Sequence, residues 1–290
     1  MPKTLTSPWI VHRQFVALPC DCGDFGRGVA CDRLQKEAFA PMSTPDFARH
    51  RLFIDQPFAA GAALALERDQ ANYLLNVLRL KAGDGIRVFN GRDGEWHAHV
   101  APEGRKSASL TLAERVKPQP PAPVLRYLFA PLKHARLDYM AQKAVEMGAG
   151  VLQPVITRRT QVSRLNLERL RANAIEAAEQ CGILCLPHIE AEKPLEAALA
   201  ELPADELLIF CDEDMAQASP VAALSALRAG GPVAVLIGPE GGFDEGERRL
   251  VRARPNTVAI SLGPRILRAD TAAVAALALV QAVLGDWSRG

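Results

Sequence analysis

The chain has 290 residues, of which 49% are hydrophobic and 23% charged, and its formal net charge is +1. This length allows two domains, and this composition is typical of a soluble globular protein rather than of a disordered or fibrous chain. A net charge near zero excludes a strongly basic surface overall, so contacts with nucleic acid would have to come from local clusters.

The N-terminal segment, residues 1–41, has no sustained hydrophobic period and is expected to be a disordered extension. Whether it belongs to the native protein stays open. Cys20, Cys22 and Cys31 match no standard zinc-ligand spacing, so no metal site is expected. The first apolar stretch is interrupted by His12 and Arg13, so it does not resemble an export signal, and we expect a reduced, cytoplasmic protein.

Residues 42–117 predict a small β-barrel, because short strands are separated by turn residues. The dipeptides Asn90-Gly91 and Asp93-Gly94 indicate a hairpin. One helix is expected over 69–78, with Asp69 as its N-cap. The predicted strands are 51–54, 63–66, 85–91, 94–100 and 107–113.

A proline-rich linker, residues 118–124, precedes a region in which strands and helices alternate up to residue 290. This alternation predicts an α/β domain with a parallel sheet and helices on both faces. Asn166 and Asp270 are expected N-caps, and Gly148, Gly182 and Gly285 are expected just after helix ends. The predicted strands are 124–130, 151–156, 186–189, 207–211, 233–237 and 257–262, and the helices are 135–147, 166–181, 194–201, 220–229, 244–253 and 271–284.

The last predicted helix, 271–284, is apolar almost all round, which indicates burial on every side and favours cover by a second subunit. Its uncharged run of about 15 residues is too short to span a bilayer, so no membrane segment is expected.

Two of the predicted strands end abruptly at Gly-Pro, in the sequences L-I-G-P-E-G-G and L-G-P-R-I-L-R-A-D-T. Both loops should lie at the carboxyl edge of one sheet, on adjoining strands, where open α/β sheets bind ligands. The sequence contains neither G-x-G-x-x-G nor G-x-x-x-x-G-K-[ST], the two glycine patterns that are typical of phosphate-binding loops. Bare backbone beside Ile266, Leu267 and Arg268 suits a ligand with a flat apolar ring and hydrogen-bonding edges.

These two loops together resemble the cofactor loops of the SPOUT methyltransferases, and specifically the family that methylates N3 of a uridine in small-subunit ribosomal RNA. The resemblance covers about residues 47–287. It implies a C-terminal parallel-sheet domain with a deep trefoil knot, preceded by a PUA-like RNA-binding barrel. It also implies S-adenosyl-L-methionine as cofactor, 16S ribosomal RNA within the assembled small subunit as substrate, and a homodimer.

The resemblance also implies residue roles. Arg268 would stabilise the negative charge that develops on the uridine when its N3 proton leaves. Glu240 and Asp270 are the nearest carboxylates that could act as general base, although Glu240 could simply bond to its own loop and Asp270 could be only an N-cap. The expected cofactor contacts are Leu236, Ile237, Gly238, Pro239, Gly241, Gly242, Leu262, Gly263, Ile266, Leu267 and Thr271.

Basic side chains in both domains could contact RNA phosphates, or could be ordinary solvated charges. The expected contacts are Arg49, Arg51, Arg79, Lys133, Lys143, Arg158 and Arg159. The block 176–182 could be plain helix surface or could border the site, and it is followed by Ile183 where the family has Arg.

Two other functions stay open. A non-catalytic RNA-binding assembly factor is favoured by the departures at Ile183, Ala269 and Asp270 from the family pattern. An α/β enzyme that uses ATP or NAD is disfavoured by the missing phosphate loops. The sequence leaves open which nucleotide is methylated, whether naked or assembled RNA is the substrate, and which residue is the base.

Overall fold

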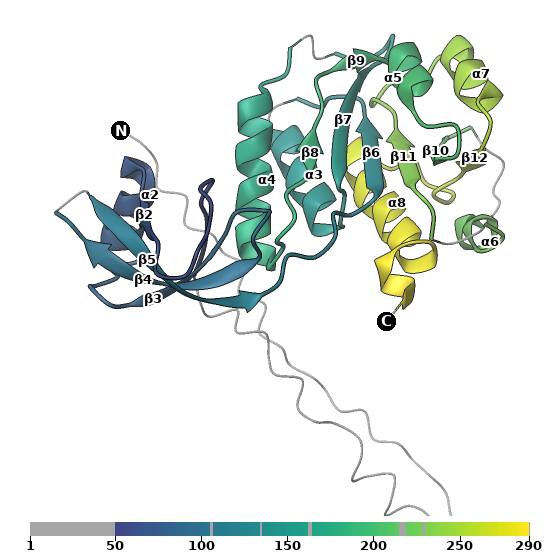
Figure 1. Ribbon diagram of the computed structural model, residues 1–290. Helices are drawn as coiled ribbons and strands as arrows, with labels where there is room; N and C mark the ends of the chain where they lie inside the picture. The colour runs from purple at the N-terminus through teal and green to yellow at the C-terminus, as the bar shows by residue number, and fades with distance from the viewer. Residues whose placement is uncertain are drawn as a thin grey trace, which may run out of the picture. The chain divides into compact units, whose positions relative to one another are not determined.

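The computed structural model of the chain describes residues 50–104, 107–133, 135–161, 164–214, 219–227 and 230–289 (Figure 1). The predicted extension over 1–41 and the predicted RNA contact Arg49 lie outside the described residues. Residues from Phe47 to Gly290 form one compact unit. The placement of a domain boundary at 118–124 stays a prediction.

The N-terminal part of this unit is a five-stranded sheet with the strand order β1-β3-β4-β5-β2. Strands β3 and β4 form the predicted hairpin, with Val88 opposite Trp96. Ala98 and Val100 are buried on the inner face, where Trp96 also packs, as the alternation along this strand indicates. The elements are β1 (Arg51–Phe53), β2 (Ala63–Ala65), α2 (Arg68–Asn72), the π-helical turn η1 (Tyr73–Val77), β3 (Gly85–Phe89), β4 (Glu95–Pro102) and β5 (Ala108–Lys117).

The C-terminal part is built on a parallel sheet with the strand order β12-β10-β11-β6-β7-β8, and β9 pairs with β7. All of its strand pairs are parallel, so the predicted fold class is confirmed. The strands are β6 (Leu125–Phe129), β7 (Val151–Ile156), β8 (His188–Ile189), β9 (Lys193–Pro194), β10 (Leu207–Cys211), β11 (Val233–Ile237) and β12 (Thr257–Ile260).

Helices cover both faces of this sheet. They are α3 (Ala135–Glu146), α4 (Leu167–Cys181), α5 (Leu195–Glu201), α6 (Pro220–Ser225), α7 (Glu245–Ala253) and α8 (Ala269–Val283), followed by the 3₁₀ turn η2 (Asp286–Arg289).

Side-chain alternation along the central strands separates two hydrophobic cores. On β11, Val233, Val235 and Ile237 face the core shared with α3 and α8. The intervening Ala234 and Leu236 face the core that includes α5 and Phe243. Because every second residue points to the same face, a fully apolar strand is what a sheet covered on both sides requires.

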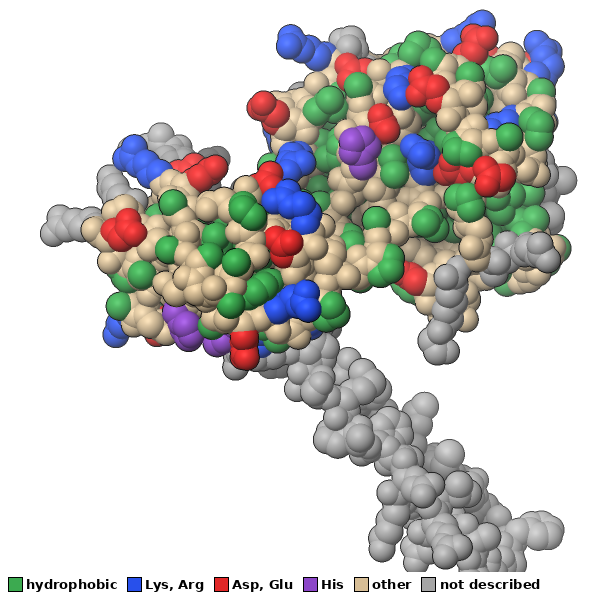
Figure 2. All heavy atoms as spheres, viewed as in Figure 1, with side chains coloured by type: hydrophobic (Ala, Val, Ile, Leu, Met, Phe, Trp, Pro, Cys, Tyr) green, Lys and Arg blue, Asp and Glu red, His purple; other side chains and the backbone are tan. Residues whose placement is uncertain are grey.

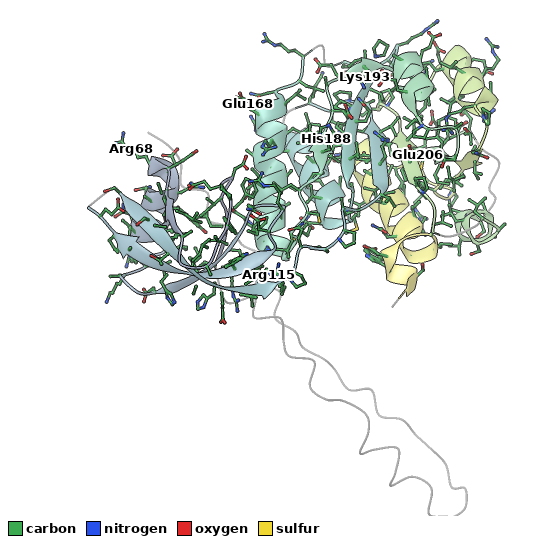
Figure 3. The ribbon with its side chains drawn as sticks, viewed as in Figure 1. Arg68, Arg115, Glu168, His188, Lys193 and Glu206 are labelled. Atoms are coloured by element: carbon green, nitrogen blue, oxygen red, sulfur yellow. The ribbon has the colours of Figure 1, made fainter. Side chains whose placement is uncertain are left out.

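The two edges of the parallel sheet differ. At the amino edge the buried carboxylate of Glu206, labelled in Figure 3, accepts a hydrogen bond from Arg126 Nε at 3.2 Å. This ion pair ties β6 to the start of β10. The carboxyl edge instead opens into a cavity, so it is the edge on which a ligand can enter.

Helix starts show where local signals succeed and fail. Asn166 is the N-cap of α4, as predicted, and its side chain accepts a hydrogen bond from Arg169 N. Asp69 and Asp270 were wrong as N-caps, because Glu67 caps α2 through a capping box with Gln70, and α8 begins two residues early with Arg268 as its N-cap. In α8 the side chain of Asp270 is then available for another partner.

Helix α8 lies in the core of the α/β part. Its residues Ala273, Ala276, Leu277 and Val280 are buried, and it packs against α3 and β11. The helical stretch Ala269–Ser288 is long and apolar enough to cross a membrane by length and composition. The length of the uncharged run alone therefore underestimated the length of the apolar helical stretch. Packing inside the protein buries 39% of the most apolar window of this stretch. The threading of this end of the chain through a knot stays a prediction.

Candidate active site

A cavity of about 400 Å³ opens at the carboxyl edge of the parallel sheet. Its volume lies within the range of small-molecule sites. The walls are residues 211–213 after β10, residues 237–242 at the end of β11, and residues 261–267, 269 and 272 after β12. The prediction that the two Gly-Pro loops meet at one edge is therefore confirmed.

The two loops do not come from adjoining strands, as the sequence led us to expect. Strand β10 lies between β11 and β12, so its own loop forms the third wall of the cavity. This loop brings Asp212 and Glu213 into the lining, and neither residue was singled out from the sequence. Their place in an acidic run directly after a buried strand is the signal that could have identified them.

Most of the predicted cofactor contacts line this cavity, and two of them, Leu236 and Thr271, do not. Leu236 points into the opposite core, because it alternates with Ile237. Thr271 is exposed outside the lining, and Ile266 is 95% exposed on the rim. The predicted contacts that line the cavity are Ile237, Gly238, Pro239, Gly241, Gly242, Leu262, Gly263, Ile266 and Leu267.

Glycine has a different role on each side of the cavity. Gly263 has φ of +101°, and a Cβ atom placed on it would meet nothing within 4 Å. At Gly238 a Cβ atom would come within 2.5 Å of the ring of the buried Phe243. The first loop can therefore pack closely only with glycine at 238, and the second exposes backbone polar groups that a ligand can approach.

A buried carboxylate supports the third wall. The side chain of Asp212 is 0% exposed, and its oxygens accept hydrogen bonds from Arg248 Nε at 3.2 Å and Arg252 Nη2 at 2.5 Å. Arg248 also donates to Glu213 Oε1 at 2.7 Å. These charge-assisted contacts join the loop after β10 to α7, because a carboxylate can be buried only with such partners.

Arg136, in the first turn of α3, joins Glu240 in the first Gly-Pro loop to Asp270 in the first turn of α8. Its Nε and Nη2 atoms donate to the two carboxylate oxygens of Asp270, at 3.1 and 3.3 Å. Its Nη1 atom donates to Glu240 Oε1 at 2.9 Å. Sequence reasoning missed Arg136, which lies 104 residues before Glu240 and 134 before Asp270.

This fork affects the two proposed bases differently. Hydrogen bonds from Arg136 lower the pKa of Asp270 below the usual value for aspartate. The Asp270 side chain is 16% exposed, whereas that of Glu240 is 40% exposed and has one contact with the guanidinium. Asp270 is therefore held as an anion by two hydrogen bonds from the guanidinium, whereas Glu240 accepts one.

Arg268 is exposed at the start of α8 and does not line the cavity. No hydrogen bond or ion pair joins its side chain to any other described residue. Its backbone carbonyl accepts a hydrogen bond from Ala272 N at 2.7 Å, which fixes its position at the helix start. The guanidinium is thus available to a ligand beside the cavity rather than within it.

One predicted RNA contact, Arg51, is a structural residue instead. Its side chain is 10% exposed and pairs with the buried Glu95 at 2.7 Å. Its two terminal nitrogens donate to carbonyl oxygens of Ala178, Glu179 and Ile183 at the end of α4. All three guanidinium nitrogens are therefore used within the protein, where they satisfy a helix C-terminus.

The block 176–182 at the end of α4, which could have bordered the site, has a structural role. Glu179 Oε1 accepts a hydrogen bond from Phe53 N at 2.8 Å, and burial raises the pKa of this carboxyl. Ile183 packs in a small core with Phe53 and Phe89. This block ties α4 to β1.

The other predicted RNA contacts are more accessible. Lys143 pairs with Glu146 at 2.7 Å, and Arg158 pairs with Asp244 at 3.0 Å while remaining 77% exposed. Arg159 donates to the carbonyl of Gly241 in the first Gly-Pro loop. Arg79 and Lys133 are exposed.

Basic and acidic side chains are mixed over the visible face of the α/β part in Figure 2. On this face, an interface with RNA would therefore depend on individual side chains rather than on a broad basic surface.

Comparison with known proteins identifies the family. Residues 119–281 match the RNA methyltransferase domain, and residues 66–113 match the RNA methyltransferase PUA domain. The proteins named ribosomal RNA small subunit methyltransferase E from Rickettsia conorii and Synechocystis are 34% and 31% identical to this chain. The alignments cover 80% and 81% of the chain, and 95% and 78% of those proteins.

Two solved structures resemble the fold closely. The ribosomal RNA small subunit methyltransferase E from Neisseria gonorrhoeae, bound to S-adenosyl methionine, has a TM-score of 0.74 and 27% identity. A putative methyltransferase from Legionella pneumophila, in complex with its cofactor SAM, has a TM-score of 0.71 and 29% identity. Each match covers 82% of this chain and 99% of the other chain. Together with the domain matches, these relatives show that the chain belongs to the RNA methyltransferase family that includes ribosomal RNA small subunit methyltransferase E.

Proposed function

We propose that this protein transfers a methyl group from S-adenosyl-L-methionine to N3 of one uridine in 16S ribosomal RNA. The observation that carries the proposal is the cavity at the carboxyl edge of the sheet, with bare backbone at Gly263 and Arg268 beside it. It is supported by relatives solved with this cofactor and named for ribosomal RNA.

The residues of the cavity fit this cofactor. Ile237, Leu262 and Leu267 provide apolar surface for a flat adenine ring, and the loop backbones provide hydrogen bonds to its edge. Glu213 provides a carboxylate that could accept hydrogen bonds from ribose hydroxyls. When bound, the cofactor supplies an electrophilic methyl group, so the protein has mainly to align the reactants.

The protein's own groups have two tasks in the reaction. Arg268 donates hydrogen bonds to the uracil oxygens, on which negative charge develops as the N3 proton leaves, so it stabilises the transition state more than the ground state. Glu240 accepts that proton, since Asp270 is held as an anion by Arg136. Arg136 holds both loops in register without touching the reacting atoms.

A homodimer is part of the proposal. Several apolar side chains of α8 stay partly exposed after packing on α3 and β11, and Trp287 just beyond the helix is 53% exposed. A second copy would cover this surface and border the cavity near Ile266, which is 95% exposed. Sedimentation equilibrium of the purified chain should give twice its mass of 31.3 kDa, and a monomer at micromolar concentration would contradict this part.

The function is tested in two steps. Calorimetric titration with S-adenosyl-L-methionine should show one site per chain. Incubation with tritiated cofactor should then label 16S RNA, given either as assembled small subunits or as naked RNA, and mass spectrometry should place the methyl group on a uridine N3. Cofactor binding without labelling of either substrate would favour a non-catalytic RNA-binding factor, and absence of cofactor binding would refute the proposal.

A further inference from the structure

We propose that a second groove, formed by the starts of α3 and α4, binds one nucleotide of the RNA strand next to the methylated base. This inference rests on the proposed function and assigns a substrate subsite to it. We name it the α3–α4 groove. Its lining is Leu132, Lys133, Leu137, Asp138, Gln161, Arg164, Leu165, Asn166, Arg169 and Leu170.

The α3–α4 groove has a volume of about 420 Å³, which is similar to that of the cavity between the Gly-Pro loops. The first turn of α3 connects the two sites. Arg136 in this turn donates a hydrogen bond to Glu240, which lines the cavity, while the nearby Lys133 and Leu137 line the groove. An RNA strand that places one base at the cavity can therefore place a neighbouring nucleotide in the groove.

The charges in the α3–α4 groove favour an anion. Its lining contains three basic side chains and one carboxylate. Asp138 is already neutralised by Arg169, which binds both of its oxygens, and it also accepts a hydrogen bond from Asn173 Nδ2 at 2.8 Å. Arg169 is thus paired within the protein, and the other two basic side chains remain available to a ligand.

Lys133 and Arg164 are the two that remain. Both are exposed, and neither side chain forms a hydrogen bond or ion pair with another residue in the described part of the chain. They come from different loops, one before α3 and one before α4, and converge on one groove. Two converging cations are suited to the phosphate of a strand that crosses the groove.

The apolar part of the lining distinguishes a nucleotide from a simple anion. Leu132 and Leu170 are buried beneath the groove, and Leu137 and Leu165 are half-buried in its wall. Leucine side chains can pack against the face of any base, whereas they would add nothing to the binding of phosphate alone. The N-terminus of α4 contributes a further favourable field for the phosphate.

The test uses the full chain, with Lys133→Gln and Arg164→Gln as single and double variants. Because both side chains are exposed, these changes should leave the urea midpoint unchanged. Arg249→Gln is the matched control, since Arg249 is an exposed arginine on α7, away from the α3–α4 groove. The probes are 16S RNA, as naked RNA and as assembled small subunits, and S-adenosyl-L-methionine.

Each single variant should raise the apparent KM for RNA by about tenfold and reduce the slope of log K against log salt by about 1. The affinity for S-adenosyl-L-methionine should stay within about twofold of the parent, because neither residue lines the cofactor cavity. RNA binding by the double variant that equals that of Arg249→Gln would overturn the proposal. A loss of affinity for S-adenosyl-L-methionine as large as the loss of affinity for RNA would also overturn the proposal.

A second measurement locates the contact directly. RNA that carries 4-thiouridine beside the target position should crosslink, on illumination, to peptides containing residues 132–137 or 164–170. Crosslinks confined to other peptides would refute the subsite while leaving methylation intact. If the parent protein neither binds the cofactor nor labels RNA, the proposed function itself fails, so the two failures are distinguishable.

Discussion

Replacement of Arg268 by Ala should separate catalysis from binding. The side chain is exposed, has no ion pair within the described residues and makes no side-chain cap for α8. Its loss should change the free energy of unfolding by no more than about 0.5 kcal/mol, as for other exposed positions. Cofactor affinity should stay within about threefold, because Arg268 does not line the cavity.

Turnover by Arg268→Ala should fall strongly, in contrast to stability and cofactor affinity. Removing one donor that stabilises charge in a transition state costs about 2.7–4 kcal/mol, which corresponds to a decrease in kcat of about 100-fold to 1,000-fold. Initial rates with tritiated S-adenosyl-L-methionine and saturating RNA give kcat, and calorimetry gives the dissociation constant of the cofactor.

The matched control is Arg265→Ala, which removes the same charge three residues earlier on the rim of the cavity. Because Arg265 has no assigned contact with the reacting base, its kcat should fall by less than about tenfold. Arg268→Lys should recover only part of the activity, since a single ammonium group cannot reproduce the planar fork of donors. Near-normal turnover by Arg268→Ala, or equal losses in both alanine variants, would refute the assigned role.

Three further outcomes concern the framework of the site. Arg136→Gln should lower the free energy of unfolding by about 1–3 kcal/mol at pH 7, because Asp270 loses a charge-assisted partner. In urea titrations this loss of stability should shrink as the pH falls below about 4, because a carboxyl with a lowered pKa stabilises the fold only while it is ionised. A loss of stability that does not change with pH would contradict this reasoning. Gly238→Ala would place a Cβ atom 2.5 Å from the Phe243 ring and should cost about 1–3 kcal/mol and weaken cofactor binding, whereas unchanged stability and binding would show that the loop can yield. Phe243→Ala should cost about 3–5 kcal/mol in the same titrations, because the ring is fully buried, and a cost below about 1 kcal/mol would be inconsistent with its packing.

Short-range sequence patterns predicted most secondary-structure elements of the α/β part. The strands Val151–Ile156, Leu207–Cys211 and Val233–Ile237 have the predicted bounds, because a short apolar run is a local property of the sequence. The predicted helix starts at Asp69 and Asp270 were wrong, because the choice between nearby polar residues as N-cap depends on which side chain has another partner.

The roles of charged side chains were less predictable. From the sequence, Arg51 could equally be a phosphate contact or an ordinary charged side chain. In the structure it donates hydrogen bonds to carbonyl groups at the end of α4, more than 120 residues away along the chain. Arg136 carried no recognisable pattern, although it joins the two loops whose acidic residues had been weighed as bases. Ion pairs of this kind depend on which surfaces meet, so the identity of a partner is absent from the local sequence.

The sequence by itself determined that strands and helices alternate, that two strands end in glycine-rich loops, and that the last helix is apolar. These features follow from hydrophobic period and backbone geometry, which act over a few residues. Only the tertiary structure decided that β10 separates the two loops and brings Asp212 to the cavity, and that Arg136 joins Asp270 to Glu240. The order of strands in a sheet is set by packing between distant segments, and local periodicity does not specify which segments become neighbours.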